Sequence, residues 1–205
     1  MTRRGSYAKG IAKREEILTT ALEVVDRAGF RGASVRELAD AVGLSQAGLL
    51  HYFDSKEELF TAILRKRDEV DQARTAPGAD MVETLLDVVR HNAETPGLVQ
   101  LFASTSVAAT SDDGHPAHGW FVDRYASVLR DLAGAVRARQ AAGEIDPAVD
   151  ADRLARVLVA VSDGMQVQWM LDPDVDMAAS IELVWRLALA AVGSGAGATG
   201  ASGTA

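Results

Sequence analysis

Residues 34–59 read SVRELADAVGLSQAGLLHYFDSKEEL, and this stretch predicts how the rest of the chain is organised. Apolar residues recur at helical spacing on both sides of Gly43, a residue that can adopt the backbone conformation of a tight turn. Ser34 and Ser55 each stand three residues before a glutamate, which is the capping-box pattern, and Ser45 can cap the helix between them. The stretch therefore predicts two short helices and the start of a longer third: 34–42, 45–52 and 55 onward.

Two helices joined in this way form a helix-turn-helix when small and apolar side chains lie at their crossing. The inward positions here are Leu38, Val42, Leu44 and Leu49, with Ala39 as the small residue that permits close approach. The outer face of the second helix then carries residues that can contact base edges or approach them closely: Gln46, Ala47, Gly48, Leu50 and His51. The pattern favours a DNA-binding head, but a plain pair of packed helices would have the same spacing.

The charge distribution agrees with a head that touches an anionic partner. The net charge of −8 argues against nucleic acid on average, yet residues 1–67 hold 12 Lys and Arg against 9 Asp and Glu, whereas residues 68–205 hold 9 against 20. A basic N-terminal arm precedes the helix pair, and Lys56 stands where a phosphate contact is plausible. The arm comprises Arg3, Arg4, Lys9, Lys13 and Arg14.

The remaining segments also have helical periodicity, so we predict an all-α chain of nine helices. The first is expected at 9–28, ending at Gly29, and the helices after the head at 56–74, 80–93, 98–110, 117–142, 150–171 and 176–192. We divide the chain into a DNA-binding head, a helical effector-binding and dimerisation domain, and a disordered Gly/Ala/Ser tail: residues 1–54, 55–192 and 193–205.

Composition excludes several classes of protein. The chain of 205 residues is 48% hydrophobic, which is enough for a substantial core, and it contains no cysteine for disulfides, thiolate chemistry or sulfur-ligated zinc. No stretch is apolar for long enough to cross a membrane, and we expect the protein in the cytoplasm. Since no nucleophile elbow, P-loop or zinc-protease motif appears, we expect no enzyme activity and no cofactor.

Taken together, residues 34–59 resemble the signature of the tetracycline-repressor (TetR) family of one-component bacterial regulators, and the resemblance extends over about Ile11 to Leu64. It implies a homodimer that binds a palindromic operator, with a larger helical domain that binds a small effector and thereby releases the DNA. By position, the resemblance implies base contacts from Arg36, Gln46, Ala47, Gly48 and His51, and phosphate contacts from Ser34, Ser45, Tyr52 and Lys56. Leu50 departs from the pattern, because members commonly have tyrosine there.

The C-terminal half offers candidates for the other two functions. Apolar faces of the last two helices suggest a four-helix dimer interface: Leu154, Val157, Val161, Ile181, Val184, Trp185 and Leu189. Aromatic, methionine and polar residues could line an effector pocket, although a set of this kind at helical spacing is more often ordinary core: Phe102, Trp120, Phe121, Tyr125, Met165, Gln166, Trp169 and Met170.

Two alternatives stay open. A loop with Asp112, Asp113, His115 and His118 could hold a metal ion through oxygen and nitrogen ligands, which would suit a helical enzyme or metal protein. The surplus apolar helix faces would also suit an adaptor that binds only other proteins.

Overall fold

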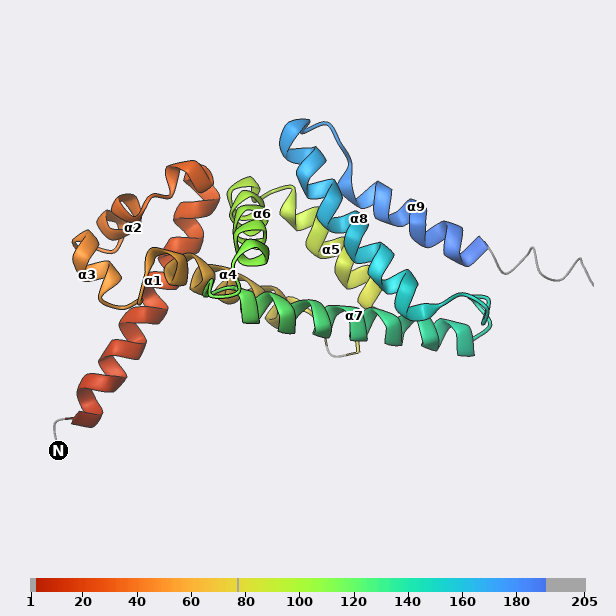
Figure 1. Cartoon of the computed structure of the whole chain (residues 1–205), viewed down its shortest axis with the longest axis horizontal. Coiled ribbons are helices and arrows are strands. Elements are labelled where there is room, and N and C mark those ends of the chain that lie inside the picture. Colours follow the sequence, from red (N-terminus) through yellow and green to blue (C-terminus); the bar gives the residue numbers. More distant parts are fainter. Residues whose placement is uncertain (1–2, 77, 191–205) are drawn as a thin grey trace, which may run out of the picture. The chain divides into compact units, whose positions relative to one another are not determined.

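The computed structural model describes residues 3–76 and 78–190, and every regular element in these ranges is an α-helix (Figure 1). These described residues form nine helices, as the sequence predicts: α1 (Arg3–Gly32), α2 (Val35–Ala41), α3 (Gln46–Leu50), α4 (Lys56–Arg74), α5 (Met81–Asn92), α6 (Pro96–Ser111), α7 (His118–Ala141), α8 (Ala151–Leu171) and α9 (Met177–Ala190). The tail predicted to be disordered, 193–205, lies outside them. None of the helices described is long and apolar enough to cross a membrane.

The described residues form two compact units. The first contains α1–α4, α6, the end of α5 and the first residues of α7, and the second contains the rest of α5 and α7 together with α8 and α9. The division predicted at residues 54 and 55 differs from these units, because α4 and α6 both pack on α1. The N-terminal unit is therefore larger than the three-helix head that the sequence suggests.

Helices α1, α3 and α6 show the differences from the predicted bounds that have a local explanation. The α1 helix begins at Arg3, so the predicted basic arm is part of the helix, and Gly29 interrupts its path with a φ of 71° and a ψ of 165°. The α3 helix ends at Leu50, two residues early, because Tyr52 and Phe53 donate their backbone N–H groups three residues back, to Leu49 and Leu50. The α6 helix starts early, since proline is well tolerated at its first position, Pro96.

The core of the first unit is built on α1. Ile17, Leu18 and Val25 are buried, with exposures of 0–4%, whereas Ile11 of the same helix is 50% exposed. Buried side chains from the other helices of the unit, and Phe53 between α3 and α4, complete this core: Leu38, Leu49, Phe53, Leu59, Ile63, Leu98 and Leu101.

Helix α6 approaches α1 closely at Gly97, the second residue of α6. A Cβ atom placed there would lie 2.0 Å from the carbonyl oxygen of Val25 and 2.8 Å from the Cα of Gly29. Both neighbours are backbone atoms, which cannot rotate away as a side chain could. The contact therefore requires glycine at position 97 for steric reasons.

The second unit has its own core, to which helices α5, α7, α8 and α9 and the loop before α8 contribute buried side chains: Val82, Leu86, Val89, Leu132, Val136, Ile145, Leu158, Ile181 and Trp185. Gln140 of α7 ties the following loop to this unit by donating to the carbonyl oxygens of Asp146 and Val149 at 3.1 and 2.8 Å. The α8 helix then begins at Asp150, whose carboxylate accepts a hydrogen bond from the backbone N–H of Arg153.

Gly97→Ala should lower the free energy of unfolding by about 2 kcal/mol or more, because the new methyl group can be accommodated only by moving α6 away from α1. The matched control is Gly119→Ala, since Gly119 is the second residue of α7 and a Cβ there meets nothing within 4 Å. Chemical denaturation of both variants checks this; equal stability of the two would contradict the steric argument.

Candidate functional site

The first helix of the pair, α2, is held by a complete capping box, as predicted. The Ser34 hydroxyl accepts from the Glu37 backbone N–H at 3.2 Å, and the Glu37 carboxylate accepts from the Ser34 backbone N–H at 3.0 Å and from its hydroxyl at 2.9 Å. These hydrogen bonds, the one from the backbone foremost, hold the pKa of Glu37 below its ordinary value. The hydroxyl of Ser34 therefore already donates its proton to Glu37.

The turn between the helices depends on Gly43, which has a φ of 67°. Its N–H bonds the carbonyl of Asp40 at 3.2 Å, and the N–H of Leu44 bonds that of Ala39 at 2.9 Å, which is the Schellman arrangement at a helix end. The chain then enters α3 at Ser45, whose hydroxyl accepts from the Gly48 N–H at 3.0 Å.

Burial separates the two faces of the helix pair as the sequence predicts. Leu38, Ala39, Val42 and Leu49 are buried, and Leu44 is half-buried. The residues expected to contact DNA are exposed, except for Gly48 and Tyr52, which are half-buried: Ser34, Arg36, Ser45, Gln46, Ala47, His51 and Lys56. All the predicted contact residues thus lie on or beside the open face of one compact helix pair, and their roles stay predictions.

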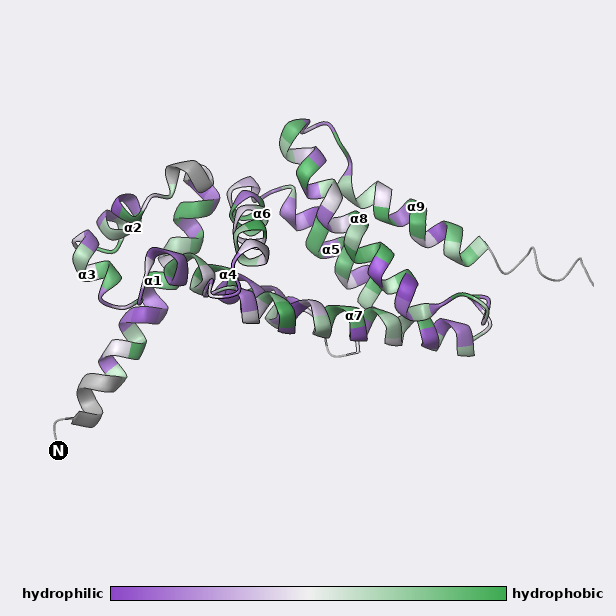
Figure 2. Ribbon diagram, in the orientation of Figure 1, coloured by the Kyte–Doolittle hydropathy of each residue, from purple (hydrophilic) through white to green (hydrophobic). Residues whose placement is uncertain are grey.

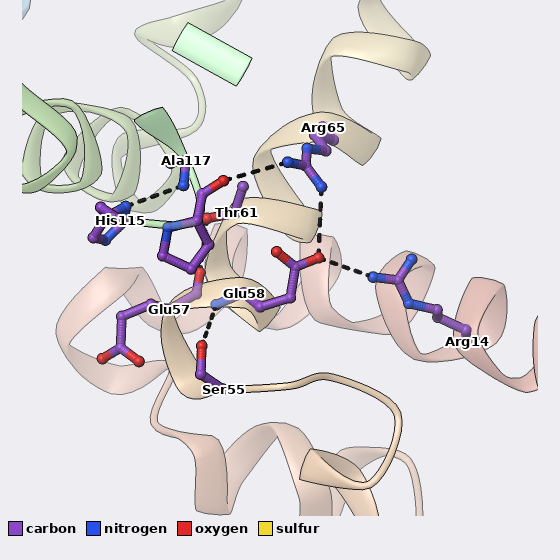
Figure 3. A network of polar contacts seen from close by, with 9 residues as sticks. Arg14, Ser55, Glu57, Glu58, Thr61, Arg65, His115 and Ala117 are labelled. Atoms are coloured by element: carbon purple, nitrogen blue, oxygen red, sulfur yellow. Dashed lines mark hydrogen bonds and ion pairs between the residues drawn. The ribbon is translucent and has the colours of Figure 1, made fainter. Parts of the chain in front are cut away.

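The half-buried carboxylate of Glu58 joins α1 to α4 (Figure 3). It accepts from the guanidinium groups of Arg14 in α1 at 3.2 Å and of Arg65 in α4 at 3.5 Å. Arg65 also donates to the carbonyl oxygen of Pro116 at 3.5 Å, in the loop before α7. The predicted capping box at Ser55 is wrong in its second half, because Ser55 accepts from the Glu58 N–H while the Glu58 side chain turns to the arginines.

Several cations of the basic head are held in contacts within the protein. Lys13 pairs with Glu16 at 2.7 Å, and Lys66 pairs with Glu15 at 2.7 Å and Glu69 at 3.2 Å. The guanidinium of Arg14 also lies over the ring of Phe53, 4.7 Å from its centre. A count of charges along the sequence cannot identify these pairs, because it does not show which cations already have an acidic or aromatic partner.

Lys9 and Lys56 are exposed basic residues of the same head. The Lys56 ammonium lies 5.6 Å from the centre of the Phe60 ring, at the first residue of α4. No ion pair within the described residues engages Lys56, so its charge stays available for the predicted phosphate contact.

The Asp/His loop does not form a metal site in the part of the chain that the structure describes, where no three potential ligands come together. The Nδ1 atom of His115 accepts from the Ala117 N–H at 3.1 Å, and that of His118 lies 2.9 Å from the carbonyl oxygen of Ala109. The alternative of a metal protein using this loop therefore loses its structural basis.

The residues predicted to line an effector pocket divide between the two units. Phe102 and Phe121 lie in the first, where their rings pack edge to face with centres 5.3 Å apart and Trp120 lies beside Phe121. The other members lie in the second: Tyr125, Met165, Gln166, Trp169 and Met170.

A separate open hollow of about 540 Å³ lies in the second unit, and none of the predicted pocket residues lines it. Five of its nine lining residues are alanine or glycine, three of them from α7, and its polar residues are paired with one another. Arg139 donates to Asp80 at 2.6 Å and to Glu144 at 2.8 Å.

Polar residues of α8 form a cluster with Tyr125 of α7 inside the second unit. The Tyr125 hydroxyl donates to a carboxylate oxygen of Asp163 at 2.8 Å. Burial raises the pKa of Asp163 above its ordinary value and also raises that of Tyr125. Ser162 and Gln166 of the same helix are buried. Tyr125 and Gln166 are both predicted to line a pocket, whereas Asp163 is not, because only the packing of α7 on α8 brings Asp163 and Tyr125 together.

The predicted dimer residues occupy different environments. Ile181 and Trp185 are core residues of their own unit, so they supply packing within the chain and no free surface. Leu154, Val161, Val184 and Leu189 are partly buried, and Val157 is exposed.

An exposed stripe of apolar and small residues runs along α8, and another follows α9; Figure 2 shows green residues at intervals along both helices. The stripes comprise Val157, Ala160, Gly164, Val167 and Leu171 of α8, and Ala179, Leu183, Leu187 and Ala190 of α9. The spacing of three and four residues is visible in the sequence. Which face of each helix is exposed becomes clear only from the residues that the core buries.

Comparison with known proteins places this geometry among bacterial regulators. Residues 17–63 match the family described as "Bacterial regulatory proteins, tetR family". The HTH-type transcriptional repressor AcnR of Corynebacterium diphtheriae is 35% identical over 79 residues, which are 38% of this chain and 41% of that protein. The aligned part is thus less than half of that relative.

Longer similarity extends into the second unit. The HTH-type transcriptional repressor Rv1474c of Mycobacterium tuberculosis is 28% identical over 84% of this chain and 91% of its own length. A transcriptional regulator from Saccharomonospora viridis, solved in complex with choline, has a TM-score of 0.63 and 25% identity, covering 85% of this chain and 94% of that one.

Glu58→Gln should lower the free energy of unfolding by about 1 kcal/mol, because two partly buried guanidinium groups lose their shared carboxylate. Glu57→Gln is the matched control, since it removes the same charge from the same first turn of α4 at an exposed residue. Thermal unfolding of the full chain at low and high salt measures both variants. If the two variants have the same melting temperature at low salt, the Glu58 carboxylate does not stabilise the contact between α1 and α4.

Proposed function

Because this chain belongs to the tetR family of bacterial regulatory proteins, we propose that it is a transcriptional repressor that binds a palindromic operator as a homodimer and releases it when a small molecule binds. The observation that carries the proposal is the open face of α2 and α3, a set of exposed polar and small side chains on a pair of helices with a buried crossing.

The side chains of this face have the chemistry of base recognition. An amide such as that of Gln46 can pair with an adenine edge through two hydrogen bonds, and the methyl group of Ala47 can contact that of a thymine. The Arg36 side chain is 77% exposed, and its Nε atom lies as far as 3.9 Å from the Asp40 carboxylate. This weak pairing leaves the guanidinium able to reach guanine or phosphate. His51 closes α3 and can donate to a base acceptor or a phosphate.

Phosphate contacts fall to Lys56, Ser45 and Tyr52 on this proposal. The Ser45 hydroxyl accepts a hydrogen bond from Gly48 but keeps its own proton to donate. Ser34 differs, since its proton already bonds Glu37, so its contribution is to hold the start of α2. Half-buried Leu50 provides apolar contact where other members commonly have tyrosine.

The exposed stripes of α8 and α9 support the homodimer. Leu171 is 84% exposed, Leu187 64% and Leu183 53%, and exposed leucines at helical spacing are costly to leave in water. Ala160 and Gly164 lie between the larger residues of α8, where small side chains allow a second helix to approach closely. Two such helices from each of two chains form a four-helix interface around a two-fold axis.

A small-molecule effector is supported by the polar residues inside the second unit and by the choline bound to the Saccharomonospora viridis regulator. Binding sites selected from random duplex DNA, with the full chain as bait, test the proposal directly. We expect a palindrome with half-sites about one helical turn apart; recovery of no common sequence would contradict it.

Lys56→Gln should weaken binding about equally for all DNA sequences and flatten the salt dependence by about one unit, because one phosphate contact is lost. Gln46→Ala should instead cost about 1–3 kcal/mol at one base position and relax the preference there. Lys66→Gln is the control, since Lys66 of the same helix is engaged by Glu15 and Glu69. Fluorescence anisotropy across a salt series separates the three; a common loss in all would contradict the assigned roles.

Leu187→Glu should convert the dimer into a monomer at micromolar concentration, because it places a charge in the apolar interface. Val107→Glu provides the control, since Val107 of α6 is similarly exposed, at 66%, but lies in the first unit. Analytical ultracentrifugation distinguishes the two states. A wild-type chain that sediments as a monomer, or a Leu187→Glu variant that stays dimeric, would contradict the interface.

A further inference from the structure

We infer that α8 packs antiparallel against α8 of a second copy of this chain, crossing it at Ala160 and Gly164, with Arg153 of each copy beside the acidic loop of the other. The acidic loop is the segment after α8 that carries Asp172, Asp174 and Asp176. The inference rests on the proposed function, since it specifies how the proposed homodimer forms. It adds a direction, a register and a pair of charge contacts between the copies.

The exposed stripe of α8 extends one step further toward the N-terminus than its apolar residues. Arg153 precedes Val157 by four residues, and its side chain is 82% exposed. The complete stripe advances in alternating steps of four and three residues: Arg153, Val157, Ala160, Gly164, Val167 and Leu171. Such a repeat, with a mean of about 3.5 residues, keeps one face of a helix against a partner helix along its whole length.

The stripe is also symmetric in side-chain size about its centre. Its two smallest residues, Ala160 and Gly164, stand in the middle, and Val157 and Val167 lie one step outward on either side. Both of these pairs are centred on position 162. An antiparallel second copy therefore places Ala160 opposite the partner's Gly164 and Val157 opposite the partner's Val167, and a two-fold axis repeats each contact.

The glycine at the centre of the stripe is not required by the packing of its own chain. A Cβ atom placed at Gly164 meets nothing within 4 Å. Glycine inside a helix is less stable than alanine, and one use of glycine is to let another backbone approach closely. A second helix that crosses at Ala160 and Gly164 gives this glycine such a role, because the bare surface lets the flanking valines of the two copies meet.

The two ends of α8 differ in charge. Arg153 and Arg156 are exposed at the N-terminal end, where Arg153 has only a distant partner, Asp150 at 3.9 Å, and Arg156 has no ion pair among the described residues. The acidic loop at the other end is exposed, and none of its carboxylates has a basic partner in the described chain. Asp152 beside Arg153 is already paired with Arg137.

This charge difference favours the antiparallel direction. The register that pairs the valines places Arg153 opposite the partner's Leu171, directly beside the partner's acidic loop, and the two-fold axis forms this contact twice. Parallel pairing would place the basic ends together and the acidic loops together. Charges across an interface mainly select orientation and partner, which is the role inferred for Arg153 and the acidic loop.

The same register gives the neighbouring residues suitable contacts. Arg156 falls opposite the partner's Gln168, whose amide carbonyl can accept from a guanidinium. Helix α9 packs beside α8, and its exposed Leu183 and Leu187 then border the crossing. The pairing of α8 with its copy thus forms the centre of the proposed four-helix interface.

Cross-linking tests the direction of pairing, because the chain has no cysteine of its own. Arg153→Cys and Leu171→Cys are made in separate full-length chains, which are treated with a short bis-maleimide alone and after mixing. Positions 153 and 171 lie about 27 Å apart along α8, so in an antiparallel pair neither variant can link to itself. We expect a cross-linked dimer from the mixture only.

Arg130→Cys mixed with Leu171→Cys is the control, since Arg130 of α7 is exposed in the same unit but lies outside the stripe. This mixture should give no cross-link. Either variant of the tested pair linking to itself would show parallel pairing, and no link in their mixture would show that this face of α8 is not at the contact. Each of these results overturns the inference.

Charge reversal tests the contacts at the ends of α8. Arg153→Glu and Asp174→Arg should each raise the dissociation constant of the dimer about tenfold at low salt, because each brings like charges together twice. Mixing the two variants should restore the affinity, since both contacts then join opposite charges. Arg130→Glu, the control on α7, should leave the dimer unchanged. Sedimentation of all four preparations that shows equal affinities overturns the inferred charge contacts.

Assays of operator binding on the same preparations let the two proposals fail separately. A dimer that selects a palindrome but gives no link between positions 153 and 171 removes only the pairing of α8. A wild-type chain that sediments as a monomer removes the homodimer of the proposed function as well.

Discussion

A helix of five residues, such as α3, cannot persist on its own. The open face of α2 and α3 therefore depends on the contacts that hold α3 in place. Isolated helices much shorter than about 12 residues are marginal in water, so α3 exists only because other parts of the chain hold it. Ser45 caps its start, Leu49 is fully buried beneath it, and Phe53 anchors the turn after it. Behind them, Glu58 joins α1 to α4 and Gly97 lets α6 lie directly on α1. The open face of α2 and α3 is thus held in place by α1, α4 and α6.

The basic residues of the head fall into two groups, those paired within the protein and those left exposed, and a count of charges does not separate them. Lys13, Arg14 and Lys66 pair with acidic residues inside the scaffold and contribute to its cohesion. Lys9, Arg36 and Lys56 remain exposed, and on the proposed function they are the cations that would attract a phosphate backbone. An acidic protein can therefore bind DNA, because a few exposed cations placed together matter more than the average charge.

Helix α8 combines three roles on three faces. Its buried face, with Ala155 and Leu158, builds the core of the second unit, and its exposed stripe offers a surface for a second chain. Its polar segment holds Asp163, whose half-buried carboxylate accepts a hydrogen bond from the Tyr125 hydroxyl of α7.

The sequence by itself determined the all-α class, the nine helices of the described chain, the caps at Ser34 and Ser45 and the glycine turn, because these depend on periodicity and on hydrogen bonds within a few residues. It also separated the buried crossing from the exposed face of the helix pair. Only the tertiary structure decided that Glu58 bonds two arginines and that Ile181 and Trp185 are core residues of their own unit. It likewise decided that Tyr125 meets Asp163. These contacts join residues from 7 to 44 positions apart, and which helix face meets which partner is set by packing, which the local pattern does not encode.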